Sequence, residues 1–299
     1  MKKVLISIVA IIIIALSWYL FIKPQDYQVN FKVKTTPGTI NQAVKAWNTS
    51  MGDFKSIEQQ SLNNFIQQLA FNDSVHEYHW NVSPINDSLS QVKVNIKDAE
   101  NSLTNKIQIP FSDTDFEKKS RKTLLAFNDF LNDHLKDFKV TLVGEEDLFS
   151  TACACIPVKT SQIEKAKGMM RNYSFLNSIL FENKVELNGP PFVEVVDWDI
   201  KTDSLSYNFC YPIIRSENLP KHPDITYKRI FGKKALKAEY NGNYITSDRA
   251  WYALLNHAEL NGIEIEKKPV EVFYNNPNMG GNELQWKADI YLPIKETNE

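Results

Sequence analysis

The sequence lacks the short motifs of nucleotide-binding and serine-hydrolase chemistry. Its 299 residues contain no Gly-x-Gly-x-x-Gly, no phosphate-binding loop and no Gly-x-Ser-x-Gly. It also lacks a basic surplus, because 34 Lys and Arg are scattered among 36 Asp and Glu. A protein that binds the phosphate backbone of nucleic acid usually concentrates positive charge on one face. We therefore expect no nucleic-acid partner, and the missing motifs predict no cofactor.

Cysteine and histidine are scarce, and their spacing does not favour a metal site. The three cysteines are Cys153, Cys155 and Cys210, with no Cys-x-x-Cys pair and no neighbouring histidine. His76 and His79 lie three apart in a predicted strand, where side chains alternate, so they point to opposite faces. We expect no metal site. The cysteines are either small buried hydrophobic residues or include a disulfide from Cys153 or Cys155 to Cys210.

One long apolar run stands at the N-terminus. Val4–Ile22 contains no charged residue and lies between Lys2, Lys3 and Lys23. A run of this length can span a bilayer. The alternative is a cleaved signal peptide, because Ala15-Leu16-Ser17 has the small-x-small pattern of a cleavage site. Since apolar residues continue past that site, we predict a single-pass membrane anchor over residues 1–23.

The charges that flank this run bear on membrane topology. The short basic N-terminus favours a cytoplasmic start and C-terminal domains on the exported (periplasmic) side. Lys32 and Lys34 beyond the run oppose this orientation, although long following domains translocate largely regardless of charge. We predict the exported side, and the sequence leaves the other side as the alternative.

Residues 24–138 are predicted to form a small α+β domain. Tyr27–Thr35 alternates as a strand, and the spacing of Ile40, Val44 and Trp47 indicates a helix. A polar helix is expected over Ile57–Phe71. The further strands expected are Val75–Val82, Ser90–Ile96 and Leu103–Ile109, separated by Pro, Asn and Asp turn signals.

A long helix is predicted to close this domain. Ser112 and Asp115 resemble a capping box, and apolar residues then recur three and four apart from Phe116 to Phe138. This order of elements resembles the helix-grip fold of the SRPBCC (START-like) superfamily, in which a bent sheet wraps the last helix around an apolar cavity. The resemblance implies a ligand cavity. The alternative is a spacer that holds the rest of the chain away from the membrane.

Residues 139–299 contain an internal repeat. Leu187-Asn188-Gly189, Phe192–Val196 and Tyr207–Ile213 are echoed by Leu260-Asn261-Gly262, Pro269–Phe273 and Ala288–Ile294. Each copy reads as strand, helix and hairpin. The first strand and helix are expected at Thr151–Val158 and Ser161–Leu180, and those of the second copy at Tyr227–Tyr240 and from Ser247 onward. Two such copies side by side predict an α+β domain of antiparallel sheets with a groove between them.

The second copy carries the pattern of a known family. Tyr240-Asn241-Gly242-Asn243-Tyr244, Val270–Phe273 with Asn276-Pro277, and Ala288–Ile294 resemble the GyrI-like effector-binding domain, over Lys139–Lys295. The resemblance implies a bacterial ligand-binding module. In that family an acidic residue of the last strand, usually Glu in Thr-Glu-Ile-x-x-Pro, lies in an aromatic groove and meets cationic or polar organic ligands. Here Asp289 takes that position and is one methylene shorter.

The predicted site centres on Asp289. Side chains alternate along a strand, so Lys287, Asp289 and Tyr291 share one face, and we expect it to line the groove. Ala288 and Ile290 point to the other face and would pack under a helix. We expect residues of the neighbouring strand and of the first repeat to join Asp289. The expected ligand-binding residues are Asp289, Tyr291, Glu271, Phe273, Tyr244, Tyr240 and Asn208.

A carboxylate among aromatic rings favours particular ligands. Its charge is poorly solvated until a cation arrives, and each aromatic face adds about 0.5–2 kcal/mol of cation-π attraction. Such a site would prefer cationic or amphipathic organic compounds. The alternative is that Asp289 forms a surface ion pair with Lys287 and that Glu194 and Glu271 are edge-strand charges.

Three functions are consistent with these patterns. We predict a membrane-tethered small-molecule binding protein rather than an enzyme. The resemblance also implies an alternative, a hydrolase of reactive electrophiles such as cyclopropanoids, in which Asp289 would help to activate water. The third is a non-catalytic interaction or lipid-binding scaffold. The sequence names neither the ligand nor the oligomeric state.

Overall fold

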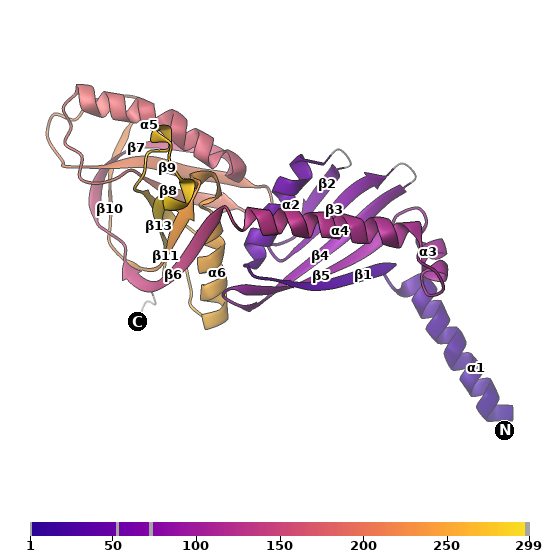
Figure 1. Ribbon diagram of the computed structural model, residues 1–299. Helices are drawn as coiled ribbons and strands as arrows, with labels where there is room; N and C mark the ends of the chain where they lie inside the picture. Colours follow the sequence, from indigo (N-terminus) through magenta and orange to yellow (C-terminus); the bar gives the residue numbers. More distant parts are fainter. Residues whose placement is uncertain (1, 52–53, 72–73, 297–299) are drawn as a thin grey trace. The chain divides into compact units, whose positions relative to one another are not determined.

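The computed structural model describes residues 2–51, 54–71 and 74–296, which divide into two compact units (Figure 1). The first unit comprises the chain up to Ile85 together with Leu89–Asn132, and the second comprises Asn86–Ser88 together with the chain from Asp133 onward. Each unit is built on an antiparallel sheet. The predicted mixed α+β class, with two antiparallel sheets and an apolar N-terminal helix, is confirmed.

The apolar N-terminal run is helical throughout. Helix α1 (Lys2–Ser17) continues into the short π-helix η1 (Trp18–Ile22), and together they form a 21-residue helix whose central window has a mean hydropathy of 2.8. None of its side chains is buried. Its length and composition fit a membrane span or a signal sequence.

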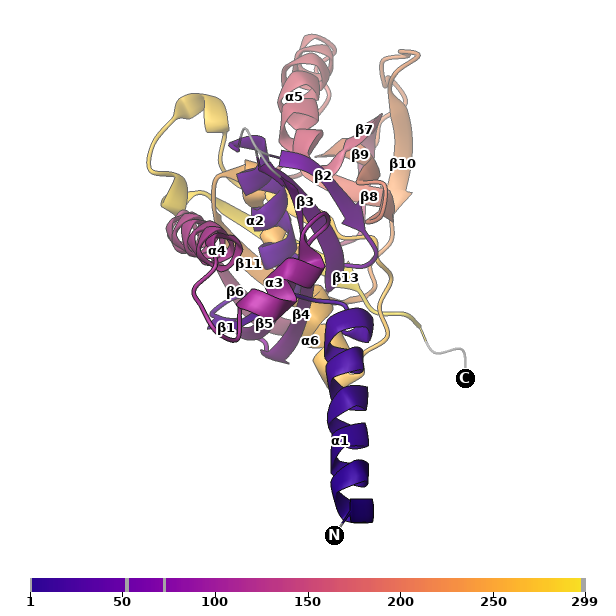
Figure 2. The same ribbon diagram turned by 90° about the vertical axis from the view of Figure 1, so that its right-hand side faces the viewer.

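The first unit is a five-stranded sheet with helices on one face (Figure 2). Helices α2 (Pro37–Thr49) and α4 (Asp115–His134) cover that face, where the Trp47 and Phe127 rings lie 5.4 Å apart and the Trp80 and Phe127 rings 5.0 Å apart. The core between sheet and helices is therefore filled with aromatic side chains. In spatial order the strands are β1 (Tyr27–Val33), β5 (Leu89–Asp98), β4 (Ser74–Asn86), β3 (Asn64–Phe71) and β2 (Phe54–Gln59).

Three local predictions for this unit are wrong. The segment Ile57–Phe71 forms β2 and β3 instead of a polar helix, and three alternate residues of β3, Phe65, Gln67 and Leu69, are buried. Leu103–Ile109 is helical, as α3 (Ser102–Gln108), instead of a strand. Helix α4 begins at Asp115, and the residue that caps it is Thr114, whose Oγ1 accepts the Glu117 N–H at 3.1 Å. Ser112 was the wrong capping residue.

The second unit contains the predicted duplication in one eight-stranded sheet. Helices α5 (Lys165–Glu182) and α6 (Arg249–Asn261), one from each repeat, pack on the same face of the sheet, which we call the helix face. In spatial order the strands are β10 (Thr226–Ile230), β7 (Thr151–Ser161), β9 (Ser204–Ile213), β8 (Phe192–Asp199), β12 (Val270–Phe273), β13 (Lys287–Pro293), β11 (Lys234–Gly242) and β6 (Phe138–Asp147).

The second repeat starts differently from the prediction. Tyr227–Tyr240 is two strands, β10 and β11, and they lie at distant positions in the sheet. Strand β6 pairs with β11 and starts at Phe138, a residue that the sequence pattern assigned to the long helix. The repeats meet in the middle of the sheet, where β8 pairs with β12.

One of the two cysteine alternatives is confirmed, because Cys155 and Cys210 form a disulfide between directly opposed residues of β7 and β9. Cys153 is free and buried, with its Sγ 3.4 Å from that of Cys155. Burial raises the pKa of the Cys153 thiol to about 11. A thiol of this kind is unreactive at neutral pH.

We predict that the purified protein carries this disulfide and that the free Cys153 thiol reacts slowly with alkylating reagents. Peptide mapping without reductant should recover a Cys155–Cys210 cross-link, while Cys153 should resist alkylation until the protein is unfolded. Cys210→Ser should lower the free energy of unfolding by about 2–4 kcal/mol, and Cys153→Ser serves as the control with a smaller loss. A cross-link that contains Cys153 would contradict this assignment.

Candidate functional site

The predicted site residues divide between the two faces of the eight-stranded sheet. In the β12–β13 pair Glu271 lies opposite Ile290 and Phe273 opposite Ala288, whereas Asp289 lies opposite Val272. Directly opposed residues of an antiparallel pair point to the same face. The expectation that Glu271 and Phe273 join Asp289 is therefore wrong, since both belong to the helix face.

The opposite face carries Asp289, Tyr291 and Asn208. We call it the closed face because a core covers its centre, and two pockets on it, one at Lys228 and one at Glu194, have charged linings. Register places Asn208, Glu194, Val270 and Tyr291 in one row across four strands. The adjacent row holds Cys210, Phe192, Val272 and Asp289. The two rows join residues of both repeats, as the duplication implies.

Apolar side chains fill much of this closed face. Phe149 packs its ring against Phe192 at 5.5 Å and against Tyr291 at 6.3 Å, so Tyr291 is part of a core. The cluster around these rings is continuous with the disulfide. Its buried members are Leu148, Cys153, Cys155, Phe192, Cys210, Ile230, Ala235, Val270, Val272 and Tyr291.

Asp289 already has cationic partners on the closed face. Its carboxylate lies 3.4 Å from Lys237 Nζ and 3.3 Å from Lys287 Nζ, and it accepts a hydrogen bond from the Tyr274 hydroxyl at 3.0 Å. The residue is 4% exposed. Burial raises the pKa of the Tyr274 hydroxyl to about 12, and the Asp289 charge adds to that rise. A guest cation would have to displace these ammonium groups.

The other acidic residues are also paired. On the closed face Glu194 accepts from Asn208 Nδ2 at 2.8 Å and forms an ion pair with Lys228, so Asn208 positions a neighbouring carboxylate. On the helix face Glu271 is fully buried with both oxygens 2.6–2.7 Å from Lys165 Nζ. Neither glutamate is an exposed edge-strand charge.

The buried pair of Lys165 and Glu271 connects the two repeats. Lys165 is the first residue of α5, in the first repeat, and Glu271 belongs to β12 of the second. Ser247 Oγ lies 2.8 Å from Lys165 Nζ and donates to Glu271 at 3.0 Å, and the ammonium lies 4.7 Å from the Trp251 ring centre. Burial raises the pKa of Glu271, and the Lys165 charge opposes that rise.

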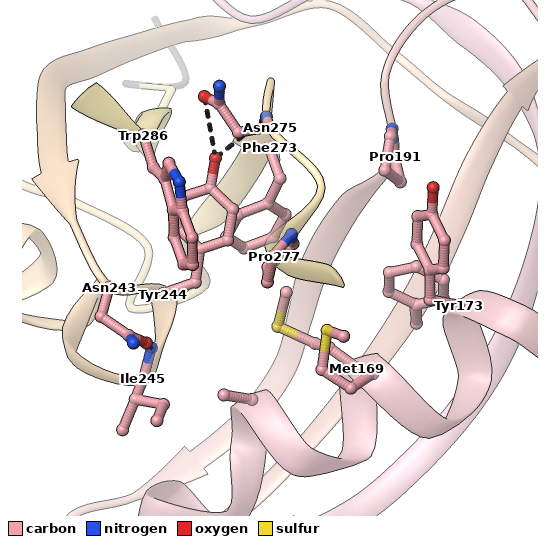
Figure 3. Close-up of a pocket in the computed structure, with 13 residues that line it drawn as sticks. Met169, Tyr173, Pro191, Asn243, Tyr244, Ile245, Phe273, Asn275, Pro277 and Trp286 are labelled. Atoms are coloured by element: carbon pink, nitrogen blue, oxygen red, sulfur yellow. Dashed lines mark hydrogen bonds between the residues drawn. The ribbon is translucent and has the colours of Figure 1, made fainter. Parts of the chain in front are cut away.

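An open pocket of about 290 Å³ lies on the helix face (Figure 3), and its lining includes Ala166, the residue after Lys165. Helix α5 supplies one wall through Met169, Met170 and Tyr173. The other wall contains Tyr244, Phe273 and Trp286 from the second repeat. None of the thirteen residues that line it is charged, and the remaining seven are Ala166, Pro191, Phe209, Asn243, Ile245, Asn275 and Pro277.

Tyr244 is held rigidly in the wall of this pocket. Its hydroxyl donates to the Lys287 carbonyl at 2.7 Å and accepts the Asn275 N–H at 3.1 Å. Its ring lies 4.8 Å from that of Phe273 and 5.7 Å from that of Trp286 (Figure 3). The rings are inclined to each other by 50–59°, so they form a concave aromatic wall, which suits the apolar body of an organic ligand.

Of the predicted residues, Tyr244 and Phe273 line the pocket, whereas Tyr240 does not. Tyr240 is buried, and its hydroxyl donates to the Asn243 carbonyl at 2.8 Å, so it supports the loop that carries Tyr244. Met169, Met170 and Tyr173 also line the pocket and were not predicted from the sequence. Their spacing on a helix was a visible signal, but the same spacing is typical of core residues.

Comparison with known proteins gives the class of the second unit. Residues 158–295 match the family model of the GyrI-like small molecule binding domain, so this part of the chain is a GyrI-like domain. No curated protein is a significant match to the sequence.

Solved structures with a similar fold include three that cover half of the chain or slightly more. The EcmrR C-terminal domain is 13% identical with a TM-score of 0.45, covering 54% of this chain and 99% of that one. SAV2435 bound to tetraphenylphosphonium is 11% identical with a TM-score of 0.38, covering 53% and 93%. A hydrolase from Listeria innocua is 11% identical with a TM-score of 0.31, covering 56% and 98%.

The structure predicts that the Lys165–Glu271 pair is essential to the second unit. Lys165→Met should lower the free energy of unfolding by about 3–5 kcal/mol, because it leaves a buried carboxylate without a cation. Lys167→Met is the matched control, since it breaks an exposed pair with Glu164 and should change the value by less than about 1 kcal/mol. Urea unfolding measures both.

A double variant separates the pair from general packing. Lys165→Met combined with Glu271→Gln removes both charges and should recover part of the stability lost in Lys165→Met. Equal losses in the Lys165 and Lys167 variants would show that the buried pair contributes nothing special.

Proposed function

We propose that the protein is a membrane-tethered small-molecule binding protein whose ligand occupies the pocket between α5 and the aromatic wall of Tyr244, Phe273 and Trp286. The observation that carries this proposal is the contrast between the two faces. The helix face offers an open pocket with an uncharged lining, whereas the Asp289 carboxylate on the closed face is already paired with Lys237 and Lys287.

The lining of the pocket favours an amphipathic organic ligand with an aromatic or alicyclic body. Two methionines can adapt their shape to such a body, and the aromatic rings can stack on it. Asn243 and Asn275 place amide groups at the same pocket, which suit one or two polar atoms of the ligand. A cationic ligand would gain cation-π attraction there but no carboxylate contact.

Two observations support a tethered location on the exported side. The helix formed by α1 and η1 has no buried side chain and is long enough to cross a bilayer, and it begins with Lys2 and Lys3. The Cys155–Cys210 disulfide fits an oxidising compartment, where such bonds persist. Together these observations support the proposal that both units lie on the exported side.

A pocket-filling variant tests the binding proposal. Ala166 lines the pocket from α5, so Ala166→Phe should occupy the space and weaken ligand binding at least about tenfold, or about 1.4 kcal/mol. Ser174→Phe adds the same ring at an exposed position of α5 and should leave binding unchanged. Titration of residues 24–299 with a neutral naphthylamine dye and with tetraphenylphosphonium, followed by fluorescence and thermal shift, measures both ligand classes.

Asp289→Asn in the same titration distinguishes the two faces of the sheet. We expect it to bind both probes as the parent does, because Asp289 lies on the closed face. Loss of binding in Asp289→Asn together with normal binding in Ala166→Phe would move the site to the closed face. Binding of neither probe by the folded parent would remove the ligand class proposed here.

A further inference from the structure

An exposed apolar patch lies on α3 and the turn after it, within the first unit. Phe111 is 87% exposed, Ile107 50% and Leu103 46%. The three residues follow each other at intervals of four, so Leu103 and Ile107 lie on one side of the short helix and Phe111 continues that side. We call them the α3 patch. Apart from α1 and η1, Ile85 and Leu125 are the other exposed large hydrophobic residues that the described part of this unit shows.

Helix α3, which carries the patch, lies beside the end of the apolar N-terminal helix (Figures 1 and 2). Lys106, on the turn of α3 that also carries Leu103, donates to the carbonyls of Leu20 at 3.3 Å and Lys23 at 2.5 Å. These carbonyls belong to the last turn of the helix, where backbone oxygens have no partner within the helix. Lys106 is buried, and its hydrogen bonds to these carbonyls cap the helix end.

A second set of contacts holds α3 from the other side. Asp26, three residues beyond Lys23, is buried, accepts from Ser102 Oγ at 2.5 Å and lies 3.9 Å from Lys106 Nζ. Its other oxygen accepts the Asp98 N–H at 2.9 Å, which ties the same point to β5. The α3 patch is therefore part of a rigid corner and cannot turn independently of the helix end.

Exposed apolar residues of η1 adjoin this corner. Trp18, Phe21 and Ile22 are each more than half exposed, on the same terminal turn whose carbonyls Lys106 caps. Aromatic residues at the end of a membrane span lie at headgroup depth. Apolar side chains next to them gain free energy when they leave water for the same layer.

We propose that the α3 patch inserts into the membrane interface and seats the first unit on the bilayer. The occupant of the patch is the lipid layer that α1 spans, so the inference rests on the proposed membrane anchor. The patch and the span together make two contacts with one bilayer. Two contacts restrict how far the first unit can tilt, whereas a single span would leave it free to swing.

Depth-dependent quenching of a fluorescent label tests whether the α3 patch inserts into the bilayer. A polarity-sensitive NBD label is placed on Phe111→Cys, Ile107→Cys or Ile85→Cys in the full chain, with Cys153→Ser so that one thiol is free. The protein is reconstituted in phosphatidylcholine vesicles that contain a nitroxide on the upper acyl chain. Ile85 is the matched control because it is 44% exposed but lies far from α3. It is roughly 33 Å along β4 from Val75, and the Val75 N–H donates to Glu100, which lies beside α3.

We expect the labels at Phe111 and Ile107 to be quenched at least twofold more than the label at Ile85. Ile107→Asp should abolish the quenching at Phe111, because a charge makes insertion of the patch unfavourable. If all three positions are quenched equally in protein that resists alkaline extraction from the vesicles, the α3 patch does not insert into the bilayer, while the membrane anchor is still supported. Release of the protein by alkali would contradict both the membrane anchor and the insertion of the α3 patch.

Discussion

The buried ion pair between Lys165 and Glu271 is the interaction on which the second unit depends. Two charges without water are stable only if nearby polar groups complete their hydrogen bonds. Here both carboxylate oxygens meet the ammonium, and Ser247 serves both partners. Because Lys165 begins α5 and Glu271 lies in the other repeat, the pair fixes where that helix starts relative to the sheet.

The pocket follows from that fixed start. Ala166, Met169, Met170 and Tyr173 occupy the next two turns of α5 and form one wall, while the opposite wall comes from the second repeat. A helix held by apolar contacts alone could shift along the sheet and change the distance between the walls. A hydrogen-bonded ion pair is directional, so it holds the helix at one position and keeps the space beside it open.

The two faces of the sheet have thereby taken different roles. On the closed face, Lys237, Lys287 and the Tyr274 hydroxyl contact Asp289, and apolar side chains with a disulfide fill the adjoining surface. A carboxylate in that setting stabilises the domain and is poorly placed to receive a substrate or activate water. The helix face instead presents aromatic groups to its pocket, and the proposed binding function rests on this difference.

Sequence patterns revealed the duplication and the apolar helix, because each rests on local periodicity or repetition. The GyrI-like domain was recognised by the resemblance of its motifs to that family. The sequence patterns failed on the relation between β12 and β13. A long connection, Tyr274–Trp286, joins those strands, so no tight turn fixes their register, and a one-residue shift exchanges the faces. The partners Lys237 and Tyr274 are equally invisible, since only the sheet brings them to Asp289. In the first unit, pairing with β4 overrides the polar composition of Ile57–Phe71.

In each unit a buried lysine fixes the end of a helix. Lys106 in the first unit and Lys165 in the second are nearly inaccessible to water, and each joins the end of one helix to a distant part of its unit. A buried ammonium accepts few arrangements, because every N–H needs an acceptor. Apolar packing tolerates small shifts, whereas these contacts do not. Rigid helix ends would suit the tethered binding protein proposed above, because the N-terminal helix and the pocket wall would each keep one orientation.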